Sequence, residues 1–377
     1  MREGWVSDRF SNCLKLKSGD NLTKKNMQEG PYPVYGGNGI AGHHSEFNLD
    51  GQNLLIGRVG ALCGNARFVN EKVWLTDNAF RIDDTYYNFD YRFLEYLLNY
   101  LNLKSYARQT AQPVISNSSL KNVQIQFPES LPEQKRIVAM LDEAFEAIDQ
   151  AKANIERNIE NAEELFQSKL NEIFSQRGEG WEEKTLGELG KVSMCKRIYK
   201  KQTSENGDIP FFKIGTFGKE PNAYIGKEIY QEYKEKYSFP KKGDILLSAS
   251  GTIGRRVVYD GKPAYFQDSN IVWIANDEEF VINPFLYHFY SICDWNPSKG
   301  ATISRLYNDD LRRIKISFPS DKRKQLKYVE MFEQVSLDSN KLVSAYSSKL
   351  NHLEELKKSI LQKAFSGELT ANEHVAA

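Results

Sequence analysis

The sequence predicts a mixed α/β protein with two pseudo-repeated α/β domains separated by an antiparallel two-helix coiled coil. Three observations support this prediction: the length of the chain, an internal repeat, and two long segments that contain no glycine. The chain has 377 residues, and at roughly 150 residues per domain this suggests two or three domains. Apolar residues make up 40% and charged residues 27% of the chain. These fractions are ordinary for a globular protein and exclude low-complexity disorder.

The second half of the chain repeats the pattern of the first half. The matched pairs are Gly4-Trp5 with Gly180-Trp181, Leu54-Leu55-Ile56 with Ile245-Leu246-Leu247, Asp77-Asn78 with Asp268-Ser269-Asn270, Ile115-Ser116 with Ile303-Ser304, and Ile125-Gln126-Phe127-Pro128 with Ile316-Ser317-Phe318-Pro319. The last pair is 191 residues apart, which is far longer than a solenoid period and indicates two copies of a whole module. Identity between the copies is low, so we expect similar scaffolds with different surfaces.

Each copy begins with a globular segment, at residues 1–130 and 179–320, that is rich in Gly, Tyr and Phe. Short runs of β-prone residues occur at 53–56, 123–127, 244–247 and 314–318. Turn signals such as Gly36-Gly37-Asn38-Gly39 separate such runs. Helical stretches are expected at 91–103 and 284–292. Each globular segment is therefore predicted to be a mixed α/β domain with a small curved sheet.

Each copy ends in a long predicted helix, at residues 131–178 and 321–367, and residues 368–377 form a tail. In the first helix, apolar residues alternate steps of four and three, which is a coiled-coil seam that slips in phase after residue 155. These residues are Ile137, Leu141, Ala144, Ile148, Ala151 and Ile155. The stripe of the second helix includes Val329, Phe332, Leu342, Leu350, Leu356 and Ala364.

The length of these helices predicts that they pack on each other. A helix of about 44 residues is roughly 66 Å long and extends beyond a compact domain. It needs a partner to bury its apolar stripe, and the other copy supplies one. We therefore expect an antiparallel pair, and the alternative is two separate core helices.

The charge is balanced overall, with 50 Lys+Arg and 50 Asp+Glu, but it is not uniform along the chain. Basic residues number 14 against 13 acidic ones in residues 1–130, and 21 against 18 in residues 181–320. The small positive excess lies on the globular segments and clusters there, for example at Lys196, Arg197, Lys200 and Lys201. Such clusters, beside Tyr, Asn, Gln and Ser, suit contacts to DNA phosphates and base edges. For any single lysine, solvated surface is the alternative.

The sequence lacks the common catalytic motifs. The segment SGTIG at 250–254 lacks the lysine and the length of a phosphate-binding loop. Asn283-Pro284-Phe285 lacks the second proline of an adenine methyltransferase motif. His43 and His44 are adjacent, so their side chains point to different sides of an extended segment and do not suit a shared metal. We therefore expect no catalytic residues, no bound metal and no cofactor on this chain.

Cysteine use and hydropathy indicate the compartment. The four cysteines are far apart and form no C-x-x-C pair, which is typical of reduced cytosolic thiols. No run of about 18 apolar residues occurs, and the first residues have no apolar core of a signal peptide. We therefore expect a cytoplasmic protein without membrane contact.

Several segments resemble, in order and twice over, the motifs of the specificity subunit of type I restriction–modification systems. They are GW at 4–5 and 180–181, PVYGGNGI at 33–40 and IPFFKIG at 209–215, RVGALCG at 58–64 and SGTIG at 250–254, QPVIS at 112–116 and ATIS at 301–304, LPEQKRIV at 131–138, and LQKAFSGEL at 361–369. The resemblance covers nearly the whole chain. One departure is DKRKQ at 321–325, where the second long helix lacks the Pro-Glu-Gln opening.

The resemblance implies a DNA-binding protein that performs no chemistry. Residues 1–130 and 179–320 would be two target recognition domains, and each would read one half of a bipartite, asymmetric double-stranded DNA target. The helices would set the gap between the halves and dock two copies of an adenine-N6 DNA methyltransferase subunit. A motor–nuclease restriction subunit would join them. S-adenosylmethionine and ATP would bind to these partners.

Loop residues that can pair with base edges are the candidate DNA-binding residues. In the first domain they are Arg58, Gln109, Thr110, Gln112 and Ser116; in the second they are Lys213, Ser250, Thr252, Arg255, Lys299, Thr302 and Arg305. For the hydroxyl residues Ser116, Ser250 and Thr252, the alternative is that they only fix their loops.

Two other functions remain open at this point. The same architecture would suit the recognition subunit of a type IIB-like restriction–methyltransferase, which cuts on both sides of its target. A helical scaffold that joins proteins and ignores DNA is favoured slightly by the zero net charge.

Overall fold

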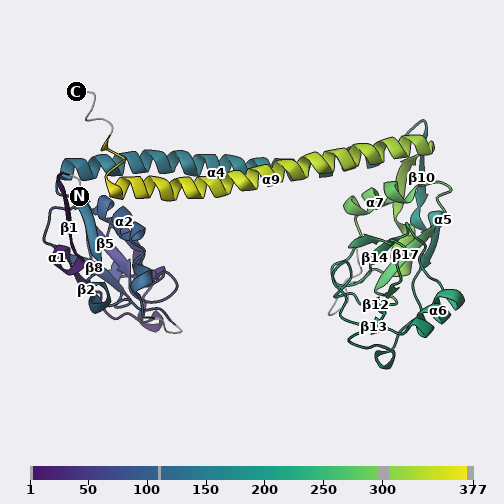
Figure 1. Ribbon diagram of the computed structural model, residues 1–377, viewed down its shortest axis with the longest axis horizontal. Coiled ribbons are helices and arrows are strands. Elements are labelled where there is room, and N and C mark those ends of the chain that lie inside the picture. The colour runs from purple at the N-terminus through teal and green to yellow at the C-terminus, as the bar shows by residue number, and fades with distance from the viewer. Residues whose placement is uncertain (1–2, 109–111, 296–304, 372–377) are drawn as a thin grey trace. The chain divides into compact units, whose positions relative to one another are not determined.

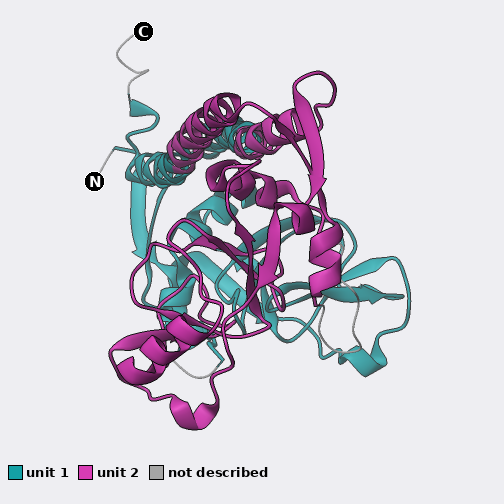
Figure 2. Ribbon diagram, turned by 90° about the vertical axis from the view of Figure 1, so that its right-hand side faces the viewer, with its two compact units in different colours: residues 1–155, 348–377 teal, residues 156–347 magenta. Residues whose placement is uncertain are grey.

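The computed structural model describes residues 3–108, 112–295 and 305–371 (Figure 1). It divides into two compact units (Figure 2). Unit 1 consists of residues 1–155 and 348–377, and unit 2 consists of residues 156–347. Each unit therefore holds one globular domain together with part of each long helix.

In the described residues of unit 1, a four-stranded sheet has the order β2-β8-β5-β6, and a three-stranded sheet has the order β4-β3-β7. A further pair joins β1 to β9, which are the first and last strands of the domain. The strands are β1 (Trp5–Arg9), β2 (Leu14–Ser18), β3 (Tyr32–Gly36), β4 (Gly39–His44), β5 (Gln52–Gly57), β6 (Ala66–Asn70), β7 (Trp74–Leu75), β8 (Ala79–Thr85) and β9 (Gln124–Pro128). The helices of this domain are α1 (Phe10–Cys13), η1 (Lys24–Asn26), α2 (Tyr91–Tyr100), η2 (Leu103–Tyr106) and α3 (Asn117–Leu120).

The described residues of unit 2 repeat this topology. The four-stranded sheet is β11-β17-β14-β15, the three-stranded sheet is β13-β12-β16, and β10 pairs with β18. The strands are β10 (Trp181–Thr185), β11 (Gly190–Ser193), β12 (Ile209–Phe212), β13 (Tyr224–Ile225), β14 (Ile245–Ser248), β15 (Arg256–Val258), β16 (Tyr265–Phe266), β17 (Ile271–Asn276) and β18 (Lys315–Pro319). The helices of this domain are α5 (Leu186–Leu189), η3 (Lys200–Gln202), α6 (Lys227–Lys236), α7 (Asn283–Ile292) and α8 (Asn308–Arg313).

Matching hydrogen bonds align the two copies residue by residue. Arg58 N donates to Asn78 O at 2.9 Å, and Ala249 N donates to Asn270 O at 2.7 Å. Likewise Ile115 N donates to Arg58 O, and Leu306 N donates to Ala249 O, both at 2.9 Å. The match of Asp77-Asn78 with Asp268-Ser269-Asn270 is therefore confirmed. Leu306 holds the place in unit 2 that Ile115 has in unit 1, and the predicted match of Ile115-Ser116 with Ile303-Ser304 lies outside the described residues.

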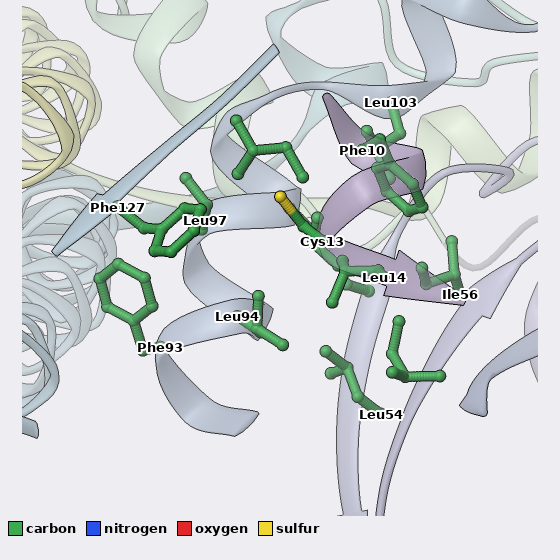
Figure 3. Packing of buried hydrophobic residues seen from close by; sticks show 14 of the residues in the cluster. Phe10, Cys13, Leu14, Leu54, Ile56, Phe93, Leu94, Leu97, Leu103 and Phe127 are labelled. Atoms are coloured by element: carbon green, nitrogen blue, oxygen red, sulfur yellow. The ribbon is translucent and has the colours of Figure 1, made fainter. Parts of the chain in front are cut away.

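The core of unit 1 forms where the four-stranded sheet meets α2 and α1 (Figure 3). Leu54 and Ile56 of β5 point into this core together with Phe93, Leu94 and Leu97 of α2, whereas Leu55 between them is buried in a separate cluster on the other face of the sheet. These side chains are almost completely buried. The period of two in the strand and the period of about 3.6 in the helix thus place one apolar face of each against the other.

Two long helices, α4 (Leu131–Phe174) and α9 (Lys322–Ser366), complete both units. In unit 1, Asp149 and Lys152 of α4 form ion pairs with Lys357 and Glu354 of α9. The order of these pairs makes the helices antiparallel. In unit 2, Phe174 at the end of α4 stacks on Phe332 near the start of α9, with ring centroids 5.7 Å apart. The predicted fold class, with an antiparallel helix pair, is therefore confirmed.

The boundaries of the helices agree with the sequence pattern, with exceptions. The expected helix at 91–103 breaks after Tyr100, and a 3-10 turn follows. The hydrophobic pattern places Leu342 and Leu356 in the apolar stripe of the second helix, but these residues are 44% and 47% exposed. At the uncertain start of that helix, Asp321 Oδ1 accepts a hydrogen bond from Arg323 N at 2.9 Å. This carboxylate satisfies one N–H group of the first turn, as a helix cap does.

Within the part of the chain that the structure describes, no helix is long and apolar enough to cross a membrane.

Aromatic packing against α4 and α9 in unit 2 leads to a prediction about pH. His288 of α7 is 8% exposed and lies among the rings of Phe166, Tyr287 and Phe332. Burial, together with the positive charge of nearby Arg256, lowers the pKa of His288 to about 4. The unfolded chain takes up this proton near pH 6.5, whereas the folded chain does not. The free energy of unfolding should therefore fall, by up to about 3 kcal/mol, as the pH drops from about 6.5 towards 4.

His288→Phe should remove this part of the acid sensitivity, because phenylalanine fills the same aromatic site without a titratable group. Urea denaturation at a series of pH values measures the free energy of unfolding of both proteins and its dependence on pH. The control is His352→Gln, since His352 is exposed on α9. Identical pH slopes for the wild type and His288→Phe would contradict the prediction.

Candidate nucleic-acid interface

Loops from three parts of the sequence meet in unit 2 around a hollow of about 380 Å³. Three cationic side chains line it, namely Arg197, Lys200 and Lys213, together with the polar loop at 267–270 between β16 and β17. All three cations are exposed. Cations grouped in a concave site raise the local concentration of an anionic ligand, and phosphate groups are such a ligand.

The loop at 267–270 organises this surface, because each of its residues bonds to a different segment. Gln267 Oε1 accepts from Ile214 N at 2.8 Å, and Asp268 Oδ2 accepts from Arg197 Nε at 2.7 Å. Ser269 O accepts from Arg305 at 3.1 Å, and Asn270 Oδ1 accepts from Ser250 Oγ at 2.8 Å. The loop therefore fixes the side chains of Arg197, Ser250 and Arg305 and the backbone at Ile214.

Ser269 is the residue inserted here relative to Asp77-Asn78 of unit 1. Its φ is +53°, which is the left-handed region that residues other than glycine rarely adopt. Backbone strain of this kind persists where the surroundings hold it in place. The bonds to Asp268 and Asn270 on either side of Ser269 provide such surroundings.

The ion pair with Asp268 holds the Arg197 side chain in one orientation. The side chain is 60% exposed, and the pair with Asp268 uses its Nε atom. The hydrogen bond to Asp268 raises the pKa of Arg197 above its usual value, so the guanidinium stays charged. Anchoring one edge of a planar guanidinium presets the direction of its remaining donors, which suits bidentate contacts.

The structure brings together most of the described residues that the sequence predicted in unit 2. Ser250 and Arg305 form a β-bridge, and both bond to the 267–270 loop. Arg255 donates to Phe217 O at 2.9 Å, so it is held against the 213–219 loop. Thr252 is exposed in the same 250–254 segment. Lys299 and Thr302 lie outside the described residues.

In unit 1, Arg58 has a different environment from the one expected of a base-reading residue. Its guanidinium donates to Asp77 O at 3.2 Å and lies over the Phe80 ring, 5.4 Å from the centroid. The residue is half-buried. These contacts favour a role in fixing the loop at 76–78.

Of the other predicted residues of unit 1, one lies on the surface and one caps a helix. Gln112 is exposed and lines a hollow of about 390 Å³ with Lys24, Asn38 and Asn78. Ser116 Oγ accepts from Ser119 N at 3.2 Å and caps α3, which is the structural alternative stated for this residue. Gln109 and Thr110 lie outside the described residues.

Sequence reasoning missed Arg197 and Lys200 in unit 2, and Lys24, Asn38 and Asn78 in unit 1, as candidate site residues. The cluster of basic residues at 196–201 was a signal for the first two, but it did not show which of them faces a hollow. Asn78 and Asn270 were noticed only because they repeat.

A larger hollow of about 760 Å³ lies elsewhere in unit 2, beside β14, α7 and α9. Besides Lys241 and Lys242, its lining includes Asp277, Glu278 and Glu333. These carboxylates would repel a polyanion, so this hollow suits DNA less well than the basic one. Among the described residues, no group of three or more His, Cys, Asp or Glu side chains could hold a metal ion.

The fold and its basic loops agree with what the chain resembles among known proteins. The family model "Type I restriction modification DNA specificity domain" matches residues 3–161 and 178–352, so both halves of the chain carry it. A putative type I restriction enzyme specificity subunit of Haemophilus influenzae is 41% identical over 297 residues, which are 77% of this chain and 76% of that protein.

Solved structures have the same fold at low identity. A chain from a structure on complex assembly and conformational transition of the type I R-M system has a TM-score of 0.76 at 18% identity, and the match covers 98% of this chain and 99% of the other. The HsdS subunit of Thermoanaerobacter tengcongensis has a TM-score of 0.62 at 18% identity, with 98% of both chains covered.

These matches define the class as DNA specificity proteins of restriction–modification systems. The chain belongs to the family of type I restriction enzyme specificity subunits.

Proposed function

We propose that the chain reads a bipartite, asymmetric DNA target with its two globular domains, residues 1–130 and 179–320, and performs no chemistry itself. The main support for this proposal is that both units have the same sheet topology but differ in the side chains of their loops. At the hollows, unit 2 presents Arg197, Lys200 and Lys213, whereas unit 1 presents Lys24, Asn38 and Gln112. Unlike side chains on equivalent loops read unlike base sequences, so the two half-sites differ.

The base contacts come from the loops around these hollows. An arginine can bond to guanine O6 and N7, a glutamine or asparagine can pair with adenine, and a serine or threonine can bond to either. The proposed DNA-binding residues are the predicted Arg58, Gln109, Thr110, Gln112, Ser116, Lys213, Ser250, Thr252, Arg255, Lys299, Thr302 and Arg305, with Arg197 and Lys200 added from the structure. For Arg58 and Ser116, the contacts described above favour the positioning of a neighbouring loop over a direct base contact.

The long helices, 131–178 and 321–367, set the gap and dock partner subunits, and residues 368–377 follow them as a tail. Each helix is continuous from one unit into the other, so its length is a fixed part of the chain. Large apolar side chains remain 44–55% exposed along the helices: Leu165, Leu326, Leu337, Leu342 and Leu356. Leu326 and Leu337 are 11 residues apart, which places them on the same face, three turns apart. Exposed apolar residues on one helix face suit the docking of another helix.

The docked partners would be two copies of an adenine-N6 DNA methyltransferase subunit and a motor–nuclease subunit. A methyltransferase must flip its target base into a dedicated pocket beside the methyl donor. S-adenosylmethionine would bind to the methyltransferase subunits, and ATP would bind to the motor–nuclease subunit. The chain itself would supply sequence recognition.

Two alternatives are separated by direct measurements. A type IIB-like system would use the same recognition chain, and the neighbouring reading frames distinguish it. A scaffold that ignores DNA is favoured by the zero net charge and the exposed leucines. A gel-shift titration distinguishes DNA reading from the scaffold function. It is done with the methyltransferase subunit present, at several salt concentrations. DNA reading predicts an affinity that falls with salt and depends on sequence, whereas the scaffold predicts no specific shift.

Replacing Arg197 tests the proposed interface of unit 2. Arg197→Ala should lower discrimination at one base pair of one half-site, by about 1–3 kcal/mol, because a bidentate contact is lost. Arg197→Lys should lose most of the discrimination but keep the phosphate attraction, since lysine lacks the planar fork. Competition binding with every single-base variant of the target measures both.

The control for this test is Arg313→Ala, which removes an exposed arginine at the end of α8, outside the hollow. An equal loss of affinity for all sequences would contradict the base contact and would indicate that Arg197 contacts phosphate instead.

Shortening the helices tests the proposed role in spacing. Residues 149–155 of α4 and 351–357 of α9 form one heptad each, and the ion pairs of Asp149 with Lys357 and Lys152 with Glu354 join them. Deleting both heptads removes about 10 Å of helix while keeping the seam in phase. The gap preferred in methylation assays should become shorter. An unchanged optimum on DNA with different spacers would show that the helices do not set the gap.

A further inference from the structure

Each long helix carries a fully buried glutamine in its first turn. Gln134 of α4 and Gln325 of α9 are both 0% exposed. They are 191 residues apart, which is the offset of the internal repeat. The second helix therefore keeps the glutamine of the Pro-Glu-Gln opening, although the residues before it differ.

In unit 1, Gln134 joins three segments with its side-chain amide. Its Nε2 donates to Pro128 O at 2.9 Å and to Asn88 O at 3.0 Å. Its Oε1 accepts from Asp90 N at 2.8 Å. Pro128 ends β9, the last strand of the domain, and Asp90 is the N-cap residue of α2.

In unit 2, Gln325 makes the same three contacts. Its Nε2 donates to Pro319 O and to Phe280 O, both at 2.8 Å. Its Oε1 accepts from Ile282 N at 2.9 Å. Pro319 ends β18, and Ile282 is the N-cap residue of α7. The two units thus share one joint between the recognition fold and the long helix.

The joint uses every hydrogen-bonding group of the glutamine. A side-chain amide has two N–H donors and a carbonyl acceptor, and here both donors and the acceptor have backbone partners. Because both glutamine residues are completely buried, a change in the angle between the domain and the helix would leave amide groups unpaired and out of reach of water. Unpaired buried polar groups are unfavourable, so the amide opposes such a change. An apolar side chain of the same size would fill the space without this directional restraint.

The contacts between domain and helix beyond the glutamine are only partly alike. In unit 1, Arg92 of α2 donates to Asp142 of α4 at 2.9 Å, and Tyr96 donates to the same carboxylate. One ring contact is shared, because Phe93 of α2 lies 5.7 Å from Phe365 of α9, and Phe285 of α7 lies 4.7 Å from Phe174 of α4. The glutamine joint adds directional hydrogen bonds that both copies retain in the same form.

We propose that Gln134 and Gln325 are positioning residues that lock the angle between each recognition domain and its helix, and thereby narrow the range of half-site gaps that the chain accepts. This inference rests on the proposed function. The residues touch no DNA in this account; they act through the two domains that they orient.

The test compares Gln134→Met and Gln325→Met, singly and together, in the complex with the methyltransferase subunit. The substrates are DNA duplexes whose gap is lengthened or shortened by one or two base pairs, and the readout is the initial methylation rate at each gap, divided by the rate at the best gap. Gln150→Met and Gln334→Met are the matched controls, because these glutamines are exposed on the same two helices and donate to neighbours on their own helix, Asn154 and Asp338.

The joint predicts a broader gap profile for the variants. The relative rate at gaps one base pair from the optimum should rise about threefold or more, as expected when a buried hydrogen-bonded restraint is lost. Base preference within each half-site should be unchanged, and the controls should keep the narrow profile. A role in stability alone would lower all rates in proportion and leave the normalised profile unchanged, which would overturn the inference.

Two further measurements keep the test decisive. If a methionine variant does not fold, Gln134→Asn and Gln325→Asn replace it, because they retain the amide but shorten its reach; an unchanged normalised profile with these variants also overturns the inference. A wild-type chain with no gap preference would instead overturn the proposed function itself, so the two failures are distinguishable.

Discussion

The structure depends on the fact that neither long helix can bury its apolar stripe alone. In unit 1, Ile137 and Leu141 of α4 share a core with Ala364 and Phe365 of α9, and in unit 2 Phe174 meets Phe332. Each helix therefore contributes residues to the core of both units. Either core is complete only when the two helices pack in antiparallel orientation. Burying apolar area at about 25 cal/mol per Å² provides the driving force, whereas the ion pairs at the exposed edge add little.

This constraint separates what the two copies must share from what they can vary. The strand order and the glutamine at the helix start determine how each domain sits on its helix, and both are the same in the two units. The exposed side chains of the loops lie outside these cores, so they can differ without loss of the fold. That division explains how one scaffold can present Arg197 and Lys213 in one unit and Asn38 and Gln112 in the other.

Periodic features of this fold were predictable from sequence, and long-range polar contacts were not. The seam from Ile137 to Ile148 and the runs at β5 and β14 follow from hydrophobic period alone. The pattern did not show that Leu342 and Leu356 face solvent, because a helix surface that follows one seam can also carry apolar residues for another partner. In the site, Arg58 was chosen for its residue type, but its bond to Asp77 O and its contact with Phe80 depend on strand pairing. Arg197 was overlooked because its partner, Asp268, lies 71 residues away.

The central claim is that two unlike domains on one helix pair each recognise part of a DNA sequence. Base-resolution methylation mapping of DNA exposed to this chain and its methyltransferase partner tests it most directly. Recognition by both domains predicts methylated adenines in two different sequence elements separated by a gap of constant length. Methylation within one contiguous element, or a pattern that stays the same when this chain is replaced by another family member, would contradict it.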